Sequence, residues 1–143
     1  MAENEQFSTI INTISDQIRN KTDLSTDDNL DELNSAINQL NILWVGDIQG
    51  DLKDSEQQKV LYLLIKTLDL CIKEYDDNVI YNFEISYLCI QSIQEFCRHF
   101  PDIIRNLTID LNQDDDNINF LDVAKKYLNP NVIQLIIEIF LDI

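Results

Sequence analysis

The segment SEQQKVLYLLIKTLDLCIKEY, residues 55–75, decides the fold class of this chain. Its apolar residues recur every three or four positions, which is the spacing of one face of an α-helix. The residues that we expect to face inward are Val60, Leu61, Leu64, Leu68, Cys71 and Ile72. Ser55 and Gln58 have the spacing of a capping box, so the pattern predicts a helix that begins near Ser55 and spans the whole segment.

Helical spacing extends outward from this segment in both directions. Towards the start of the chain, apolar residues predict helices at 4–20 and 27–44. Towards its end they predict a helix at 80–99, with Phe83 and Tyr87 on the inward face. Further helices are expected at 101–111, at 118–128 and from Pro130 to residue 141, with NQDDDN (112–117) as a polar linker. No segment shows the sustained two-residue alternation of strands, and only two glycines and two prolines are present.

These patterns predict an all-α fold in which residues 1–143 form one domain of six to seven helices. The sequence LIKTLDLC (64–71) resembles CIQSIQEF (89–96) further along the chain. Such internal similarity is typical of repeated helical hairpins, although two amphipathic helices also resemble each other by chance. A compact bundle and a short armadillo- or HEAT-like array of helical hairpins are therefore both open.

The chain is strongly acidic, and its charge is uneven. The formal net charge is −16. It is −7 over residues 21–56 and −5 over residues 100–143, but only −2 over residues 57–99. Because an acidic surface repels polyanions, we expect no direct binding to nucleic acid and none to an anionic membrane.

Cysteine usage and hydropathy predict a soluble cytoplasmic protein. Cys71, Cys89 and Cys97 lie in apolar surroundings without CxxC spacing, so we expect buried thiols in a reducing compartment. The first residues, MAENEQ, lack the basic and apolar regions of a signal peptide. The longest strongly apolar run, VIQLIIEIFL at 132–141, is too short to span a bilayer and contains Glu138.

One stretch, ILWVGDIQGDL at 42–52, contains the Gly-Asp-x-Gln-Gly pattern of the first metal-binding motif of calcineurin-like metallophosphoesterases. Such an enzyme needs several more aspartate, asparagine and histidine ligands to hold two metal ions. Here Asp47 stands alone, both glycines of the chain are Gly46 and Gly50, and the one histidine is His99. We therefore interpret the stretch as a glycine that ends a helix, followed by an acidic loop.

Other catalytic and metal signatures are also missing from the sequence. An EF-hand calcium loop needs glutamate at its twelfth position, and the candidate loops that start at Asp27, Asp47 and Asn112 do not have it. His99 suits the C-terminal end of a helix, where the dipole favours a cation. Cys71 and Cys97 lie on apolar stripes rather than beside a base. We expect no metal, no cofactor and no enzymatic activity.

Protein binding is the predicted function, and the alternative is that the acidic charge only keeps the protein soluble. The acids gather near the start of the second helix, in the loop after Trp44 and around residues 110–122, and a field of this sign attracts basic surfaces. Trp44 adds an aromatic anchor, the residue type that dominates binding energy at interfaces. The candidate partner-binding residues are Asp27, Asp28, Asp31, Glu32, Trp44, Asp47, Asp51, Asp54, Asp110, Asp114, Asp115, Asp116 and Asp122.

In its size, acidity and helicity, the chain resembles the immunity proteins of contact-dependent and other polymorphic toxin systems in bacteria. This resemblance implies an inhibitor that binds a basic, nuclease-type toxin and either covers its active-site cleft or locks a site beside it. The alternative is a helical adaptor or scaffold that docks a peptide or another domain. A nucleic-acid mimic that occupies a DNA-binding protein is a further alternative.

Overall fold

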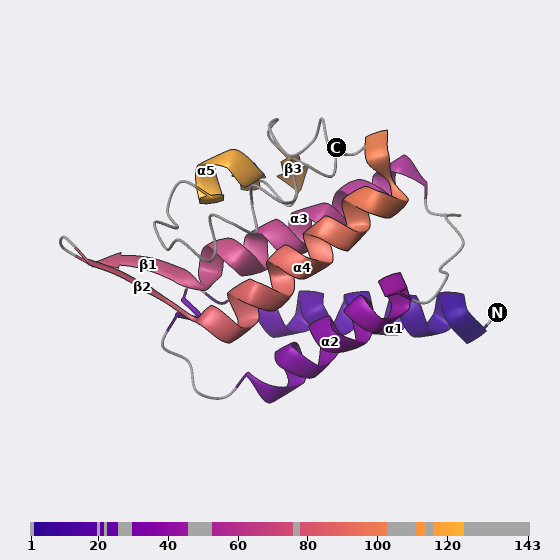
Figure 1. Cartoon of the computed structure of the whole chain (residues 1–143), viewed down its shortest axis with the longest axis horizontal. Helices are drawn as coiled ribbons and strands as arrows, with labels where there is room; N and C mark the ends of the chain where they lie inside the picture. Colours follow the sequence, from indigo (N-terminus) through magenta and orange to yellow (C-terminus); the bar gives the residue numbers. More distant parts are fainter. Residues whose placement is uncertain are drawn as a thin grey trace.

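Four long helices form the body of the protein in its computed structural model (Figure 1). They are α1 (Ala2–Ile18), α2 (Asp31–Val45), α3 (Asp54–Leu70) and α4 (Phe83–His99). The shorter elements are a hairpin of β1 (Ile72–Tyr75) and β2 (Asn78–Tyr81), a hairpin of β3 (Leu111–Gln113) and β4 (Asp116–Ile118), and the five-residue helix α5 (Phe120–Ala124). The structure describes residues 2–19, 21, 23–25, 30–45, 53–75, 78–102, 111–113 and 116–124. Helices dominate this part of the chain, which confirms the predicted all-α class.

The long helices form two antiparallel hairpins that stack on each other. Helix α1 packs against α2, and α3 packs against α4. The hairpins meet chiefly where α2 lies against α4, with a smaller contact between α1 and α3 (Figure 1). Two stacked hairpins are the packing expected of a compact bundle and also of a short hairpin array. The four helices therefore do not distinguish the two predicted architectures.

Four long helices are described, rather than the six to seven helices predicted. The predicted helix at 101–111 begins with a single 3₁₀ turn at Pro101 and Asp102, and residues 103–110 lie outside the described part of the chain. The predicted helix from Pro130 to residue 141 also lies outside it. The predicted helix at 118–128 is described only to Ala124, where it corresponds to α5.

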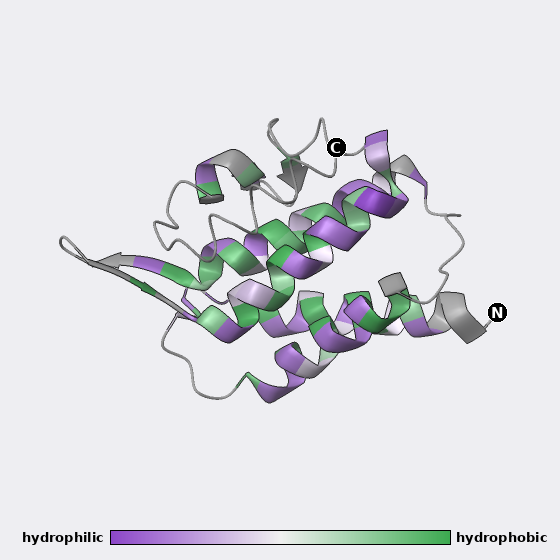
Figure 2. Ribbon diagram, in the orientation of Figure 1, coloured by the Kyte–Doolittle hydropathy of each residue, from purple (hydrophilic) through white to green (hydrophobic). Residues whose placement is uncertain are grey.

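Helix α3 is buried on nearly all sides from Val60 onward. Its predicted inward residues are buried, and so are residues that the predicted stripe does not include, namely Tyr62, Leu63, Ile65, Thr67 and Leu70. The second face is covered by α5 and by the β3–β4 hairpin, in which Leu111 and Ile118 are buried. Figure 2 shows the run of hydrophobic residues along α3. From Val60 to Leu70 only Lys66 and Asp69 are partly exposed, so this part of α3 is the central element of the fold.

The predicted helix at 55–75 is wrong in its last five residues, because α3 ends at Leu70 and the chain turns into a β-hairpin. The strands pair antiparallel, with Ile72 opposite Tyr81 and Tyr75 opposite Asn78. The ladder continues where the backbone N–H of Asn82 donates to the carbonyl oxygen of Cys71 at 2.9 Å. β-branched and aromatic residues in both arms favour a pleated ladder, and this preference overrides the helical spacing.

The helix starts differ from the predicted ones in their capping residues. Helix α3 begins at Asp54, and the carboxylate of Glu56 accepts from the backbone N–H of Lys53 at 3.4 Å, in place of the predicted Ser55–Gln58 box. Helix α4 begins at Phe83 because the Asn82 side chain accepts from the backbone N–H of Ile85 at 3.1 Å. Asparagine is among the best N-cap residues, since its oxygen satisfies a helix donor that would otherwise have no partner.

The segment NQDDDN was predicted to be a linker, but both of its ends belong to strands. Leu111 pairs with Ile118, and Gln113 pairs with Asp116. The two terminal apolar residues of this hairpin are both buried in the core, on the side of α3 that also carries α5. The hairpin therefore closes the second face of the central helix.

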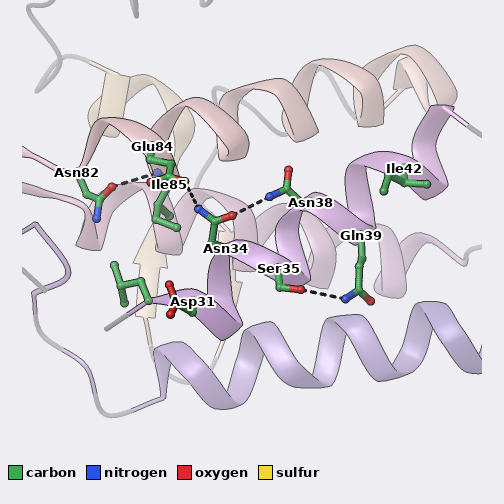
Figure 3. A pocket seen from close by; sticks show the side chains of 10 residues that line it. Asp31, Asn34, Ser35, Asn38, Gln39, Ile42, Asn82, Glu84 and Ile85 are labelled. Carbon is green, nitrogen blue, oxygen red and sulfur yellow. Dashed lines mark hydrogen bonds between the residues drawn. The ribbon is translucent and has the colours of Figure 1, made fainter. Parts of the chain in front are cut away.

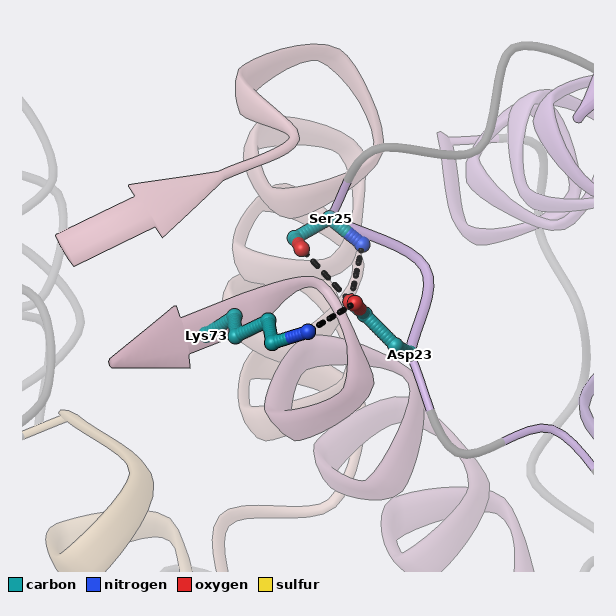
Figure 4. Close-up of polar contacts among 3 residues, drawn as sticks. All are labelled: Asp23, Ser25 and Lys73. Carbon is teal, nitrogen blue, oxygen red and sulfur yellow. Dashed lines mark hydrogen bonds and ion pairs between the residues drawn. The ribbon is translucent and has the colours of Figure 1, made fainter. Parts of the chain in front are cut away.

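A short turn after α1 joins the two helical hairpins. Leu24 is fully buried, and its backbone N–H donates to the carbonyl oxygen of Leu70 at 2.7 Å. The Asp23 carboxylate accepts from the backbone N–H of Ser25 at 2.8 Å and from its hydroxyl at 2.5 Å. The ammonium of Lys73, on β1, lies 3.3 Å from the same carboxylate (Figure 4). The turn that follows α1 is thus attached both to the end of α3 and to β1.

The environment of Asp23 predicts a stability that depends on pH. The hydrogen bonds from Ser25 and the charge of Lys73 hold the pKa of Asp23 below its usual value. Ionised Asp23 therefore stabilises the fold above the pKa of about 4 that it has in the unfolded chain, and this contribution is lost as the pH falls below that value. We expect Asp23→Asn to lower the free energy of unfolding by about 0.5–1 kcal/mol at pH 6, since the carboxylate is partly solvated.

Urea denaturation of the wild type and of Asp23→Asn at pH 6 and pH 3 measures the difference in their free energies of unfolding. This difference should be smaller at pH 3. The matched control is Asp16→Asn, which removes an exposed ion pair with Arg19 on α1. Surface pairs of this kind contribute little, so the control should change stability little at either pH. A difference between wild type and Asp23→Asn that is the same at both pH values would contradict the prediction.

The face of α3 that is covered by α5 and the β3–β4 hairpin should contribute as much to stability as the predicted inward stripe does. Ile65 lies outside the predicted stripe and is fully buried, so Ile65→Ala should lower the free energy of unfolding by about 2–5 kcal/mol. Ile42→Ala is the control, because Ile42 is 69% exposed and should lie within about 0.5 kcal/mol of wild type. A loss below about 1 kcal/mol for Ile65→Ala in urea denaturation would show that the second face is not closely packed.

Candidate functional site

The structure places only some of the predicted partner-binding acids. Asp31 and Glu32 are exposed in the first turn of α2, where Glu32 accepts from the Gln17 side chain at 2.8 Å. Asp122 is exposed on α5, which packs on α3 on the far side of the α3–α4 layer from α2 (Figure 1). These two acidic regions therefore lie on different sides of the protein and do not form one surface.

The other predicted site residues are not described at their side chains. Trp44, Asp54 and Asp116 belong to α2, α3 and β4, but the structure describes only their backbone. The remaining predicted residues fall outside the described part of the chain, and they are Asp27, Asp28, Asp47, Asp51, Asp110, Asp114 and Asp115. Their role in binding stays a prediction.

A groove with a volume of about 660 Å³ lies between α2 and the start of α4. It is lined by Leu30, Asp31, Asn34, Ser35, Asn38, Gln39, Ile42, Asn82, Glu84 and Ile85. On α2 the lining residues follow one stripe, because they are separated by three or four positions. One of the predicted partner-binding residues, Asp31, belongs to this lining.

Side-chain amides dominate the groove, and hydrogen bonds hold them in place (Figure 3). The Asn38 amide donates to the Asn34 oxygen at 2.7 Å, and the Asn34 amide donates to the Glu84 carboxylate at 2.6 Å. In the same way the Gln39 amide donates to the Ser35 hydroxyl at 3.1 Å. The Asn34–Glu84 bond crosses from α2 to α4, so it ties one wall of the groove to the other.

A smaller cavity of about 300 Å³ adjoins the groove on α4. It is lined by Asn38, Phe83, Glu84, Tyr87 and Leu88, so it shares Asn38 and Glu84 with the groove. The rings of Phe83 and Tyr87 lie 5.8 Å apart between centroids, at an interplanar angle of 33°. We call the two cavities together the α2–α4 groove, and the smaller one its aromatic pocket.

The prediction that Phe83 and Tyr87 face inward is wrong. Their exposed fractions are 45% and 36%, whereas the face of α4 that meets the core carries Ile85, Cys89 and Ile93. The spacing of that inner face was visible in the sequence, and it leaves Phe83 and Tyr87 at its edge. Asn34 and Asn38 were missed for a different reason, because polar residues four positions apart are also typical of a solvated helix face.

The charge of the α2–α4 groove has one sign. Its lining contains two carboxylates, those of Asp31 and Glu84, and no lysine, arginine or histidine. The apolar part of the lining is also accessible, since Ile42 is 69% exposed. The arrangement offers hydrogen-bonding amides, negative charge and exposed apolar side chains on one surface.

The described residues contain no group of three or more histidine, cysteine or acidic side chains placed to hold a metal ion. Burial raises the pKa of Cys71 and of Cys97 to about 12, and that of Cys89 lies well above its ordinary value for the same reason. A thiol in this state is a poor nucleophile, because the thiolate is the reactive form. His99 lies in the last turn of α4, as predicted.

Thiol chemistry tests this description. Cys71, Cys89 and Cys97 are buried and free, so the native protein at pH 8 should react slowly with Ellman's reagent. Unfolding in guanidinium chloride should make all three thiols react at the rate of an exposed cysteine. Rapid reaction of even one thiol in the native protein would contradict the burial described here.

Comparison with known proteins identifies no relative. No protein-family model, no curated protein and no solved structure matches this chain. Among the described residues, no helix is both long enough and apolar enough to cross a membrane. The function must therefore be argued from the surface itself.

Proposed function

We propose that this protein is a non-enzymatic binding protein that takes a basic protein partner in the α2–α4 groove. The observation that carries the proposal is the position of the exposed apolar side chains. Four large apolar residues are exposed among the described residues, and three of them, Ile42, Phe83 and Tyr87, line this groove. Exposed apolar residues that gather on one surface are typical of protein interfaces.

The composition of the groove supports a protein partner. Interfaces combine aromatic or aliphatic anchors with a surrounding rim that makes hydrogen bonds. Here Phe83 and Tyr87 provide the aromatic anchor, and the amides of Asn34, Asn38 and Gln39 provide donors and acceptors beside it. This combination suits a polypeptide, which presents both side chains and peptide groups.

Charge supports a basic partner. The chain carries a net charge of −16. Two of its carboxylates, those of Asp31 and Glu84, line the groove, and Glu32 is exposed nearby on α2. An acidic surface attracts a basic one over several ångströms and speeds their encounter. The finer form of the proposal is an inhibitor of the immunity type that binds a basic, nuclease-type toxin and covers its cleft.

Two other binding functions are compatible with the same features. A helical adaptor would extend the two hairpins into an armadillo- or HEAT-like array, with the predicted helices at 101–111 and 130–141 completing six to seven helices. A nucleic-acid mimic would use the acids to occupy a DNA-binding protein. The identity of the partner separates the three, because only the first requires a toxin.

The proposal predicts which substitutions weaken binding. The test is co-purification from the source cells, together with co-expression of the product of the adjacent reading frame. Phe83→Ala with Tyr87→Ala should weaken the complex at least about tenfold, because it removes the aromatic anchor. Asp31→Asn with Glu84→Gln should slow association, and raising the salt concentration from ~50 to ~500 mM should do the same to the wild type.

Matched controls come from outside the groove. Ile80→Ala removes the fourth exposed apolar side chain, which lies on β2, and Asp122→Asn removes an exposed acid on α5. Both variants should bind as tightly as the wild type. Recovery of an acidic partner, or a groove variant that binds as tightly as Ile80→Ala does, would refute the proposal.

A further inference from the structure

We infer that the aromatic pocket is the binding site for one arginine side chain, presented by an extended segment of the partner. This inference rests on the proposed function, and it adds the side chain and the backbone conformation that the groove recognises. It depends on three features of the described residues, namely the rings of Phe83 and Tyr87, the carboxylate of Glu84, and the side-chain amides of α2.

The walls of the pocket match a guanidinium group. Phe83 and Tyr87 lie one helical turn apart on α4, both are partly exposed, and their rings are tilted by only 33° from parallel. A cation that lies against such rings is attracted by the negative charge of their faces. The volume of about 300 Å³ is sufficient for a long, flat side chain.

Glu84 supplies the opposite charge. It lies between the two aromatic residues in sequence and lines the pocket beside them. One of its oxygens accepts from the Asn34 amide at 2.6 Å, which holds the carboxylate on the side of α4 that faces α2. A carboxylate oxygen has more than one lone pair, so this bond leaves capacity for an incoming donor.

The combination favours arginine over lysine. A guanidinium group is planar, so it can stack on an aromatic ring while its edge donates hydrogen bonds to a carboxylate. An ammonium group is a compact, strongly hydrated charge without a flat face, so its contact with a ring is weaker. A neutral side chain would gain the apolar contact but lose the charge attraction to Glu84.

The amides beside the pocket match an extended backbone. The Asn38 amide bonds to the Asn34 oxygen at 2.7 Å, and the Asn34 amide bonds to Glu84 at 2.6 Å. Each of these amides has a second N–H, which can donate to a peptide carbonyl oxygen of an extended segment, since the peptide groups of such a segment are not bonded to each other. A helical segment would offer no such groups, because its peptide groups bond to each other.

The length of the groove sets the length of the segment. Its lining on α2 runs from Asp31 to Ile42 (Figure 3), which is about 17 Å along the helix axis. This length accommodates about five residues of extended chain. The arginine enters the aromatic pocket from the part of the segment that passes Asn38, because Asn38 belongs to both cavities.

The experiment uses the full chain and three blocked heptapeptides of serine and glycine. Their central residue is arginine, lysine or citrulline, which has the shape of arginine without its charge. Binding is followed through the backbone amide resonances of the isotope-labelled protein at millimolar peptide. We expect the arginine peptide to shift resonances of residues 83–88 and of Asn38, and to bind at least about fivefold more tightly than the citrulline peptide.

Variants identify the groups responsible. Glu84→Gln keeps an acceptor for Asn34 and should weaken arginine binding about threefold to fivefold, whereas Glu95→Gln, on the same helix, should leave it unchanged. Phe83→Leu with Tyr87→Leu keeps apolar side chains but removes the ring faces, so it should weaken arginine binding about fivefold. Unchanged spectra of the variants outside the substituted helix turn would show that they are folded.

The experiment distinguishes a failure of the arginine site from a failure of the proposed function. Equal binding of the arginine and citrulline peptides, equal binding of the lysine peptide, or shifts confined to other parts of the protein would overturn the arginine site. These failures would leave the proposed function in place, since that depends on whether the groove variants lose the natural partner. If the partner binding survives those variants while the arginine peptide binds as expected, the proposed function fails and the pocket is a separate cation site.

Discussion

The burial of α3 on nearly all sides is the constraint on which the rest of the structure depends. Each exposed Å² of its apolar surface would cost about 25 cal/mol, so every side of the helix must be covered. Helix α4 covers one side, α1 another, and α5 with the β3–β4 hairpin covers a third. Helix α2 packs instead on α1 and α4, outside this shell. One face of α2 has no part in covering α3, and this face lines the polar groove together with the start of α4.

The sequence predicts the parts of this fold that depend on local spacing. The five apolar residues of the first predicted helix are all buried, namely Phe7, Ile10, Ile11, Ile14 and Ile18. In the second predicted helix the same holds for Leu30, Leu33, Ile37 and Leu40, whereas Leu43 is partly buried. What the sequence does not predict depends on contacts between distant residues. The second face of α3 is buried by residues some fifty positions later, and the β1–β2 hairpin exists because two arms pair across a turn. The periodicity of one segment predicts neither the covering of α3 nor the pairing of β1 with β2.

The position of the candidate site could not be predicted from the sequence. An acidic protein with an exposed aromatic anchor was expected, and Asp31 is common to the predicted residues and to the groove. However, the described acids of α2 and α5 lie on different sides of the protein, and the aromatic residues of the groove are Phe83 and Tyr87. Net charge does not depend on where the acids lie, whereas a groove depends on how two helices cross. The position of a site between helices therefore requires the packing to be known.

The contact between α2 and α4 contains a buried polar group that lowers the stability of the fold. The Asn41 side chain lies within it and donates to the Leu88 carbonyl oxygen at 3.4 Å, while its own buried oxygen has no hydrogen-bond partner among the described residues. A buried acceptor without a partner costs about 1–3 kcal/mol, which an aliphatic residue at this position would avoid. The same contact holds the Asn34–Glu84 bond at its rim. Local violations of the packing rules concentrate at functional sites, so polar groups along this one helix contact favour binding there over binding at the closely packed contacts of α3.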